Sequence, residues 1–369
     1  MARVLVLALV LAFAPVAGAA QVPVFHPQLQ VGGFPTGITL NTKTDTIYVG
    51  NGTTQSLSLI DGRKCNAGNA SGCGQRVTAV TAGDDPIGIA VDEATNTVYA
   101  ANFSGTVAVV DGKRCDGANT SGCKIAPRTV RVGLGPQFLA VDEATHTVYV
   151  ANSSSNSVSV IDSKTHRVRA TVAVGPAPFA VAVNEVTNSI YVTDLGAPTV
   201  SVINGGTCNA SITSGCRRKP VSVNVGDTPG GVALNSRTNT IYVTGEASSD
   251  VSVINGMTCN AHTTSGCRQK PVRIAAGLGA RGIDVNEATD TVYVANTAAN
   301  TVSVIDGRTC NASVTSGCAK ASPVAEVGVS PRRVAVDQVT NTVYVTNAGS
   351  NSVTMLNGRT CDSAEHTGC

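Results

Sequence analysis

The chain has 369 residues, of which 14% are charged and 4% aromatic, and its formal net charge is +2 at pH 7. The charged fraction is well below the level of about 25% that is usual in soluble domains. The near-neutral balance gives no electrostatic support for binding to nucleic acid or to an anionic membrane, so no nucleic-acid partner is expected. Abundant Val, Thr, Ser, Asn and Gly are typical of β-structure.

The first 20 residues, MARVLVLALVLAFAPVAGAA, have the pattern of a secretory signal peptide. Arg3 precedes an apolar run, and small residues follow, with cleavage expected after Ala19 or Ala20. The apolar run from Val4 to Ala14 is too short to span a bilayer comfortably, and no later run is long enough. We therefore expect an exported protein without a transmembrane anchor, located in the periplasm, outside the cell or at the cell surface, with residues 21–369 forming one domain.

After this segment, HPQLQVGGFPTGITL (residues 26–40) predicts a short strand near Gln28 to Val31, a turn and a second strand. A phrase such as IYVGN or VYVAN then recurs every 42 to 51 residues. The motif [DN]-x-x-T-[NDH]-[TS]-[IV]-Y precedes it in all seven copies. These copies hold every tyrosine of the chain: Tyr48, Tyr99, Tyr149, Tyr191, Tyr242, Tyr293 and Tyr344.

Each motif predicts a β-hairpin. An Asp or Asn such as Asp92 or Asn235 is expected to accept hydrogen bonds from the turn backbone. The Asn, Asp or His that follows, such as Asn96 or His146, is a residue type that tolerates the left-handed conformation. Alternating Val or Ile with Thr or Tyr then continues as a strand.

One whole unit shows four predicted antiparallel strands, at residues 282–286, 291–296, 300–306 and 323–328. Four strands per unit at this period predict an all-β, seven-bladed β-propeller. The seventh unit ends at Cys369 after its third strand. We therefore expect the N-terminal strand to complete the last blade and close the ring.

The phrase Tyr-Val-Thr-Asn occurs intact at residues 344–347, beside G-x-x-P-x-x-[IV]-A-V-[DN] and N-[TS]-V-[ST]-V-[IL]-[DN]. Over residues 28–360 the chain resembles the YVTN β-propeller repeat family. The resemblance implies a seven-bladed propeller like those of exported and surface-layer proteins of microbes. Related propellers include lactonases and a streptogramin lyase, so an enzymatic function has to be considered.

Twelve cysteines lie in six loops of the form C-x7-C, between the third and fourth strands of a unit. The unit between Tyr149 and Tyr191 is nine residues shorter and lacks both cysteines, which is what pairing inside each loop predicts. Zinc ligation would leave coordination positions unfilled at this spacing, and redox catalysis would need C-x-x-C. The predicted disulfides are Cys65–Cys73, Cys115–Cys123, Cys208–Cys216, Cys259–Cys267, Cys310–Cys318 and Cys361–Cys369.

Charged residues on the face that carries the cysteine loops are sorted along the chain. Acidic residues occupy the first turn of the units, at Glu93, Glu143, Glu185 and Glu287. Basic residues flank the loops, at Arg63, Lys64, Lys113, Arg114, Arg217, Arg218, Lys219, Arg268 and Lys270. This pattern predicts either solvated turns of mixed charge or a surface for a polyanionic partner such as a cell-envelope polymer.

The opposite face has one irregularity in its innermost strands. Asp284 replaces the usual Ala or Thr in the sixth unit, where Arg281 also replaces a small or apolar residue. Arg332 and Arg333 occupy the corresponding entrance of the seventh unit. These four residues are the candidate ligand-binding residues, as a structural ion pair between Asp284 and an Arg or as a site for a small anion.

No catalytic residue, cofactor or metal site is predicted. None of the five histidines falls in a loop expected to surround the channel mouth. The recurring Asn51, Asn102, Asn152, Asn296 and Asn347, with Asp194, are interpreted as turn caps. The leading prediction is a non-catalytic binding or structural module whose partner is a protein or a cell-envelope polymer. The alternatives are a lactonase-like or other metal-assisted hydrolase or lyase, and a subunit of an extracytoplasmic redox complex.

Overall fold

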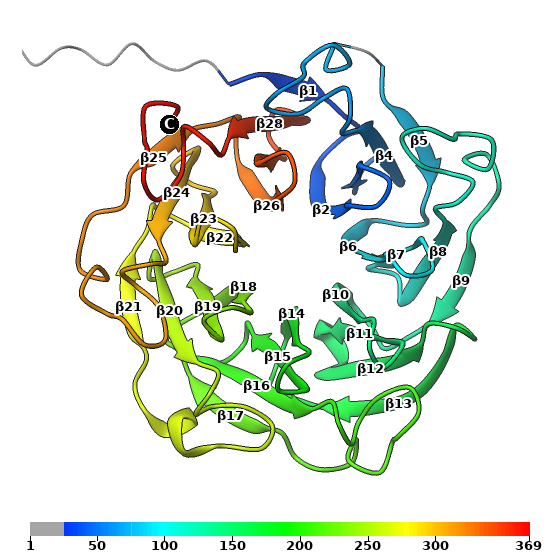
Figure 1. Cartoon of the computed structure of the whole chain (residues 1–369). Helices are drawn as coiled ribbons and strands as arrows, with labels where there is room; N and C mark the ends of the chain where they lie inside the picture. Colours follow the sequence, from blue (N-terminus) through cyan, green and yellow to red (C-terminus); the bar gives the residue numbers. More distant parts are fainter. Residues whose placement is uncertain (1–25, 75) are drawn as a thin grey trace, which may run out of the picture.

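In the computed structural model, residues 26–74 and 76–369 are described, and they form seven four-stranded antiparallel sheets arranged radially around a central axis (Figure 1). The seven-bladed propeller predicted from the repeats is therefore confirmed. The predicted signal peptide lies outside the described residues. From the axis outward, the four strands of each blade are called a, b, c and d.

The strands a surround the axis and the strands d form the rim (Figure 1). The a strands are β2 (Pro35–Asn41), β6 (Pro86–Asp92), β10 (Pro136–Asp142), β14 (Pro178–Asn184), β18 (Pro229–Asn235), β22 (Ala280–Asn286) and β26 (Pro331–Asp337). The b strands are β3 (Thr46–Asn51), β7 (Thr97–Asn102), β11 (Thr147–Asn152), β15 (Ser189–Asp194), β19 (Thr240–Gly245), β23 (Thr291–Asn296) and β27 (Thr342–Asn347).

The outer half of each blade consists of strands c and d. The c strands are β4 (Ser56–Asp61), β8 (Thr106–Asp111), β12 (Ser157–Asp162), β16 (Thr199–Asn204), β20 (Asp250–Asn255), β24 (Thr301–Asp306) and β28 (Ser352–Asn357). The d strands are β5 (Thr78–Thr81), β9 (Arg128–Arg131), β13 (Arg167–Ala173), β17 (Val221–Asn224), β21 (Val272–Ala275), β25 (Val324–Glu326) and β1 (Gln28–Gln30). Blades are numbered one to seven from β2 onward.

The N-terminal strand closes the ring, as predicted. β1 pairs antiparallel with β28, with Leu29 opposite Val353, and it supplies strand d of blade seven. Leu29 is buried in a core cluster that joins this blade to Ile47 and Val49 of blade one. The first and last parts of the chain therefore share one packed seam.

The strands b are buried on both faces because each sheet is packed between two neighbours. All six residues of β3, β11 and β23 are buried, which explains why Val and Ile occupy both faces of these strands. The strands d instead alternate between exposed and buried residues, as edge strands with one solvated face do. Hydrophobic burial is therefore concentrated between blades.

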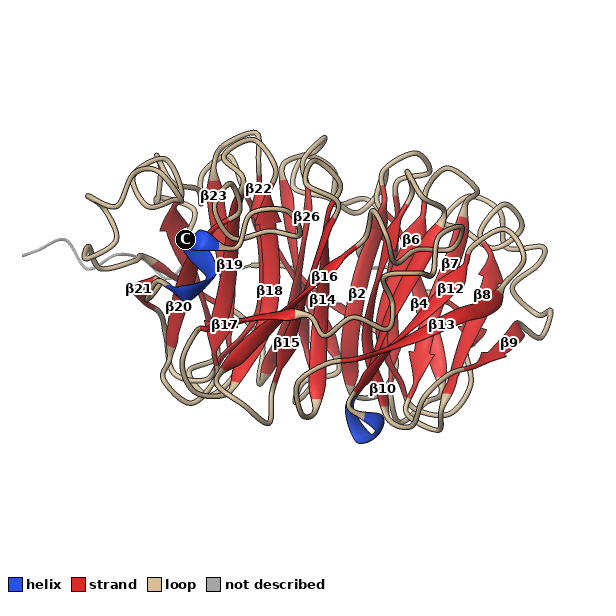
Figure 2. Ribbon diagram, turned by 90° about the horizontal axis from the view of Figure 1, so that it is seen from below, coloured by secondary structure: helices blue, strands red, loops and turns tan. Residues whose placement is uncertain are grey.

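The turns between strands a and b form as the motif predicts. Asp92 Oδ1 accepts a hydrogen bond from the backbone N–H of Thr95 (3.0 Å), and Asn96 and His146 have positive φ values of 53° and 54°. These turns lie on the same face as the c–d connections, and the b–c and d–a turns lie on the other face (Figure 2). Two short 3-10 helices, η1 (Ser153–Ser155) and η2 (Ser265–Arg268), occur among the strands. No helix in the described part of the chain is long and apolar enough to cross a membrane.

Candidate functional site

The six cysteine loops, each running from the first to the second cysteine of a pair, are closed by disulfides inside the loop. The structure pairs the residues as the shared absence of two cysteines in blade three predicts. The first cysteine of each loop is fully buried or nearly so. Six disulfides indicate an oxidising, exported environment.

Each cysteine loop also holds its blade to the preceding blade, which the sequence did not reveal. Tyr149 of blade three donates a hydrogen bond of 2.7 Å to the carbonyl of Cys208 in blade four, and the N–H of Ala210 donates to Thr147 Oγ1 (2.8 Å). The same tyrosine bond recurs at five more seams: Tyr48 to Cys115, Tyr191 to Cys259, Tyr242 to Cys310, Tyr293 to Cys361, and Tyr344 to Cys65. The tyrosine in each repeat was the available signal, but its acceptor lies in another repeat.

Blade three, which has no cysteine loop, is the exception. Tyr99 of blade two donates to the carbonyl of Ser163 (3.2 Å), and its hydroxyl lies 3.4 Å from Nδ1 of His166. The c–d connection is a tight turn, so β13 starts at Arg167, directly opposite Asp162. The c–d connection that contacts the preceding blade is therefore shorter between blades two and three than at the other six seams.

The acidic residues of the a–b turns bridge neighbouring blades. Glu93 accepts the N–H of Thr42 (2.7 Å), and Glu143 in turn accepts the N–H of Glu93 (2.6 Å). Glu185 and Glu287 accept N–H groups from the preceding blades in the same way. These carboxylates are therefore occupied with structural contacts, which accounts for their repetition.

The central channel is lined by the strands a, and its d–a end differs between blades. The third residue of strand a is small in five blades, at Gly37, Gly88, Ala180, Gly231 and Gly282, but it is Phe138 in blade three and Arg333 in blade seven. A methyl group added to Gly231 would lie 3.1 Å from Nη1 of Arg333. The small residues thus leave the space that the Arg333 side chain fills.

Arg333 is buried at 9% exposure and lies against two phenylalanines. Its guanidinium carbon is 3.6 Å from the ring centre of Phe138 and 5.1 Å from that of Phe179. Nη2 is buried and has no hydrogen-bond partner among the described residues. Burial, and then the nearby charge of Arg281, lower the pKa of Arg333 to about 9, so the group stays positively charged at neutral pH.

Two further arginines lie at the same end of the channel. Arg281 Nη1 forms an ion pair of 2.7 Å with Glu246 and lies over Phe179, and Arg332 lies over Phe34. Burial and the charge of Arg281 lower the pKa of Arg332. Three cations face one carboxylate here, so the local charge is positive. The structure thus brings together Arg281, Arg332 and Arg333, three of the four residues that the sequence singled out.

Asp284 differs from the sequence-based expectation. No arginine in the described chain forms an ion pair with it; its carboxylate accepts N–H groups from Val285 (2.8 Å) and Val336 (2.8 Å). The reason is its depth, because Asp284 lies three residues further along β22 than Arg281, whose partner is Glu246. Burial raises the pKa of Asp284 to about 6.

A cavity of about 310 Å³ occupies the channel. Arg333 and Phe138 line it near the d–a end, Asp284 lies deeper, and Leu40 and Thr42 line it toward the a–b face. Within residues 26–74 and 76–369, no group of three or more His, Cys, Asp or Glu side chains is arranged to hold a metal ion. The chemical character of the cavity therefore comes from one buried cation, one carboxyl group and apolar walls.

Comparison with known proteins identified a matching family and similar solved structures. The family model described as "Lactonase, 7-bladed beta-propeller" matches residues 128–361, more than half of the chain. A solved structure of Kuenenia stuttgartiensis hydrazine synthase is similar, with a TM-score of 0.68 and 17% sequence identity over 94% of this chain and 99% of that chain. At this identity the likeness shows the fold alone. No curated protein sequence matches the chain.

The family match bears on the resemblance noted from the repeats. Membership of the YVTN repeat family stays a prediction, because the matching model is that of the lactonase propellers. The matched segment includes the two phenylalanines that contact Arg333, Phe138 and Phe179, and all three arginines of the channel. The chain belongs to the seven-bladed lactonase β-propeller family.

Proposed function

We propose that this chain is an exported binding module whose central channel binds a small organic carboxylate. The observation that carries the proposal is the buried guanidinium of Arg333, which lines the channel cavity and has an Nη2 group without a partner among the described residues. A buried unpaired donor costs about 1–3 kcal/mol, and more when it is charged. A carboxylate ligand would supply the missing acceptor.

The stacking of Arg333 supports this function. A guanidinium held face-on against an aromatic ring keeps the N–H groups at its edge available for a carboxylate. Arg281 and Arg332 add positive potential at the same end of the channel, which attracts an anion. The cavity volume lies near the lower limit of about 300 Å³ for small-molecule sites, so the ligand is expected to be small.

Calorimetric titration of the mature protein with succinate and citrate tests the proposal. Arg333→Met keeps much of the side-chain volume but removes the charge, and we expect it to weaken binding about tenfold or more. Arg308→Met is the matched control, because Arg308 pairs with Asp306 on the surface at a c–d connection. Binding should also strengthen as pH falls through about 6, when Asp284 loses its charge. Equal affinities for wild type and Arg333→Met would refute the proposal.

Lactone hydrolysis is a second candidate, favoured by the family match and by the presence of Arg333 and Asp284 in one cavity. In this reaction the guanidinium would polarise the lactone carbonyl while ionised Asp284 accepts a proton from the attacking water. The ring C–O bond then breaks, and the proton passes to the departing alkoxide, which leaves a hydroxy acid.

A pH-indicator assay with γ-butyrolactone separates the two functions. If the chain is a hydrolase, Asp284→Asn should lose turnover but still bind carboxylates through Arg333. Hydrolysis of the lactone no faster than in buffer would reject the enzymatic function and leave the binding function standing.

A further inference from the structure

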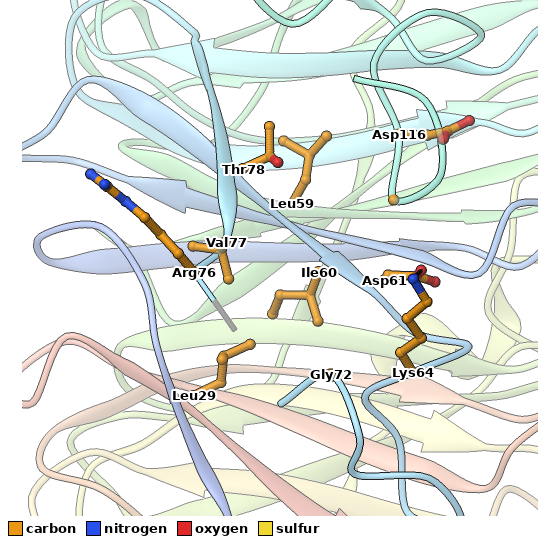
Figure 3. A pocket seen from close by; sticks show the side chains of 11 residues that line it. Leu29, Leu59, Ile60, Asp61, Lys64, Gly72, Arg76, Val77, Thr78 and Asp116 are labelled. Carbon is orange, nitrogen blue, oxygen red and sulfur yellow. Dashed lines mark ion pairs between the residues drawn. The ribbon is translucent and has the colours of Figure 1, made fainter. Parts of the chain in front are cut away.

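Three equivalent recesses lie at the rim, where strand c of one blade leads into the c–d connection. In blade one the recess has about 120 Å³, and its lining includes Asp116 of the cysteine loop of blade two (Figure 3) and the neighbouring Gly117. In blade five it has about 140 Å³, and Asn311 and Ala312 of the next cysteine loop are among the residues that line it. The loop of the following blade thus forms part of the wall of both recesses.

The equivalent recess in blade two is larger. The next blade has no cysteine loop, and only the short turn with Ser163, Lys164 and His166 borders the space. Its volume is about 670 Å³, several times that of the other two recesses and within the range of about 300–1,000 Å³ of small-molecule sites. We call it the basic cavity, after the cations that line it.

The walls of the basic cavity carry an excess of positive charge. Lys113, Arg114, Arg128 and Lys164 line it together with His166, and the one acidic residue is Asp111. None of these four cations forms an ion pair with a described residue, whereas in the recess of blade one Lys64 Nζ lies 3.8 Å from Asp61 Oδ2. The blade-five recess has a single cation, Lys270. The charge excess therefore coincides with the missing loop.

Polar and apolar groups that a cysteine loop would cover are accessible here. At the other six seams, a hydroxyl at the start of strand b accepts an N–H from the next cysteine loop, as Thr147 does from Ala210. Thr97, the equivalent residue in blade two, accepts no such N–H in the described chain and lines the cavity. Ile125 is 51% exposed and, with Val109 and Pro127, supplies an apolar wall.

We propose that the basic cavity is a binding site for a small organic anion that carries an apolar group, held by Lys113, Arg114, Arg128 and Lys164 around the anionic group and by Ile125 and Pro127 around the apolar group. The site lies at the rim, away from the channel, and it does not depend on the function proposed for the channel. Its larger volume coincides with the absence of a cysteine loop in blade three.

The probe for this site is 8-anilinonaphthalene-1-sulfonate, followed by fluorescence and calorimetry. We expect one probe molecule to bind at the basic cavity. The double variant Arg128→Glu/Lys164→Glu should bind it about tenfold more weakly than wild type, or weaker still. Lys270→Glu, in the smaller recess of blade five, is the matched control that should bind the probe as wild type does. A graft of the nine-residue loop of blade four into the c–d turn of blade three should also abolish binding.

A measurement on the wild-type protein guards against misfolded variants. In protein with isotopically labelled histidines, the probe should shift the imidazole NMR signals of His166. It should leave those of His262 and His366 unchanged, because these two residues lie in cysteine loops of other blades. Retained binding in the loop graft, or an unperturbed His166 at saturation, would overturn the proposal.

Discussion

Asp194 shows how a single residue can depart from a repeated arrangement. Five other blades have Asn at the end of strand b, and in blade seven Nδ2 of Asn347 donates to the hydroxyls of Ser352 (3.1 Å) and Thr354 (2.8 Å). In blade four the direction is reversed, because Thr199 and Ser201 donate to Oδ2 of Asp194 while its Oδ1 has no partner among the described residues. Burial raises the pKa of Asp194 to about 6.

Asp194→Asn should therefore stabilise the protein at neutral pH. A carboxyl group whose pKa in the folded state lies above its ordinary value of 3.8 makes the wild type lose stability as pH rises from about 4 to about 6. The variant has no such loss, so at pH 7 its free energy of unfolding should be higher by about 1–3 kcal/mol. Denaturant unfolding at pH 4.5 and pH 7 measures the difference.

The reverse substitution, Asn347→Asp, serves as the control. It places a buried carboxylate in the equivalent environment of blade seven and should lower stability at pH 7 more than at pH 4.5. If Asp194→Asn were less stable than wild type at pH 7, the prediction would be wrong. The reversed hydrogen bonds would then stabilise the fold more than the buried charge destabilises it.

Among the elements, the short strand β1 closes the ring although it has only three residues. It pairs along three residues with β28, and Pro27 and Val31 add hydrogen bonds to Met355 and Asn351. Leu29 is buried between the first and last blades. Without β1, blade seven would present β28 as an unpaired edge.

Deletion of residues 21–33 from the mature protein should lower the free energy of unfolding by about 3 kcal/mol or more, since it exposes Leu29's packing partners and removes the pairing with β28. Thermal unfolding followed by circular dichroism measures this. Gln28→Ser/Gln30→Ser is the control, because both side chains are exposed while Leu29 stays in place. Closure through β1 would be wrong if the truncated protein melted with the wild type.

The whole molecule shows which features were predictable from the sequence. The blade number, the turns and the disulfides were predictable because each is built within one repeat, and blade three revealed the pairing by lacking a loop. The channel was only partly predictable. Arg333 of blade seven meets Phe138 of blade three only when the ring closes, and the tyrosines find their acceptors one blade away. Periodicity reports what lies inside a repeat, and these contacts lie between repeats.

Each cysteine loop is closed within one repeat and also bonds to a neighbouring repeat. Removing one disulfide tests whether the closure inside the repeat supports the contact between repeats. Cys208→Ser/Cys216→Ser should cost about 2.5 kcal/mol on the chain-entropy model for a nine-residue ring. Because Tyr149 and Thr147 of blade three bind the same loop, hydrogen exchange should quicken in β11 as well as in blade four. The peptide 97–102 of β7 is the internal control, since blade three has no loop to lose.

Tyr149→Phe separates the effect of the hydrogen bond between blades from the effect of the disulfide. This variant keeps the bridge but removes one buried hydrogen bond, so it should destabilise the protein by about 1 kcal/mol and quicken exchange in β11 to a smaller extent. Exchange that quickens only within residues 205–220 of the cysteine variant would mean that the bridge stabilises its own loop alone. Faster exchange that extends to β11 would instead mean that each disulfide preorganises the carbonyl group that accepts a hydrogen bond from the neighbouring blade. The six disulfide-closed loops would then together stabilise the closed ring of blades.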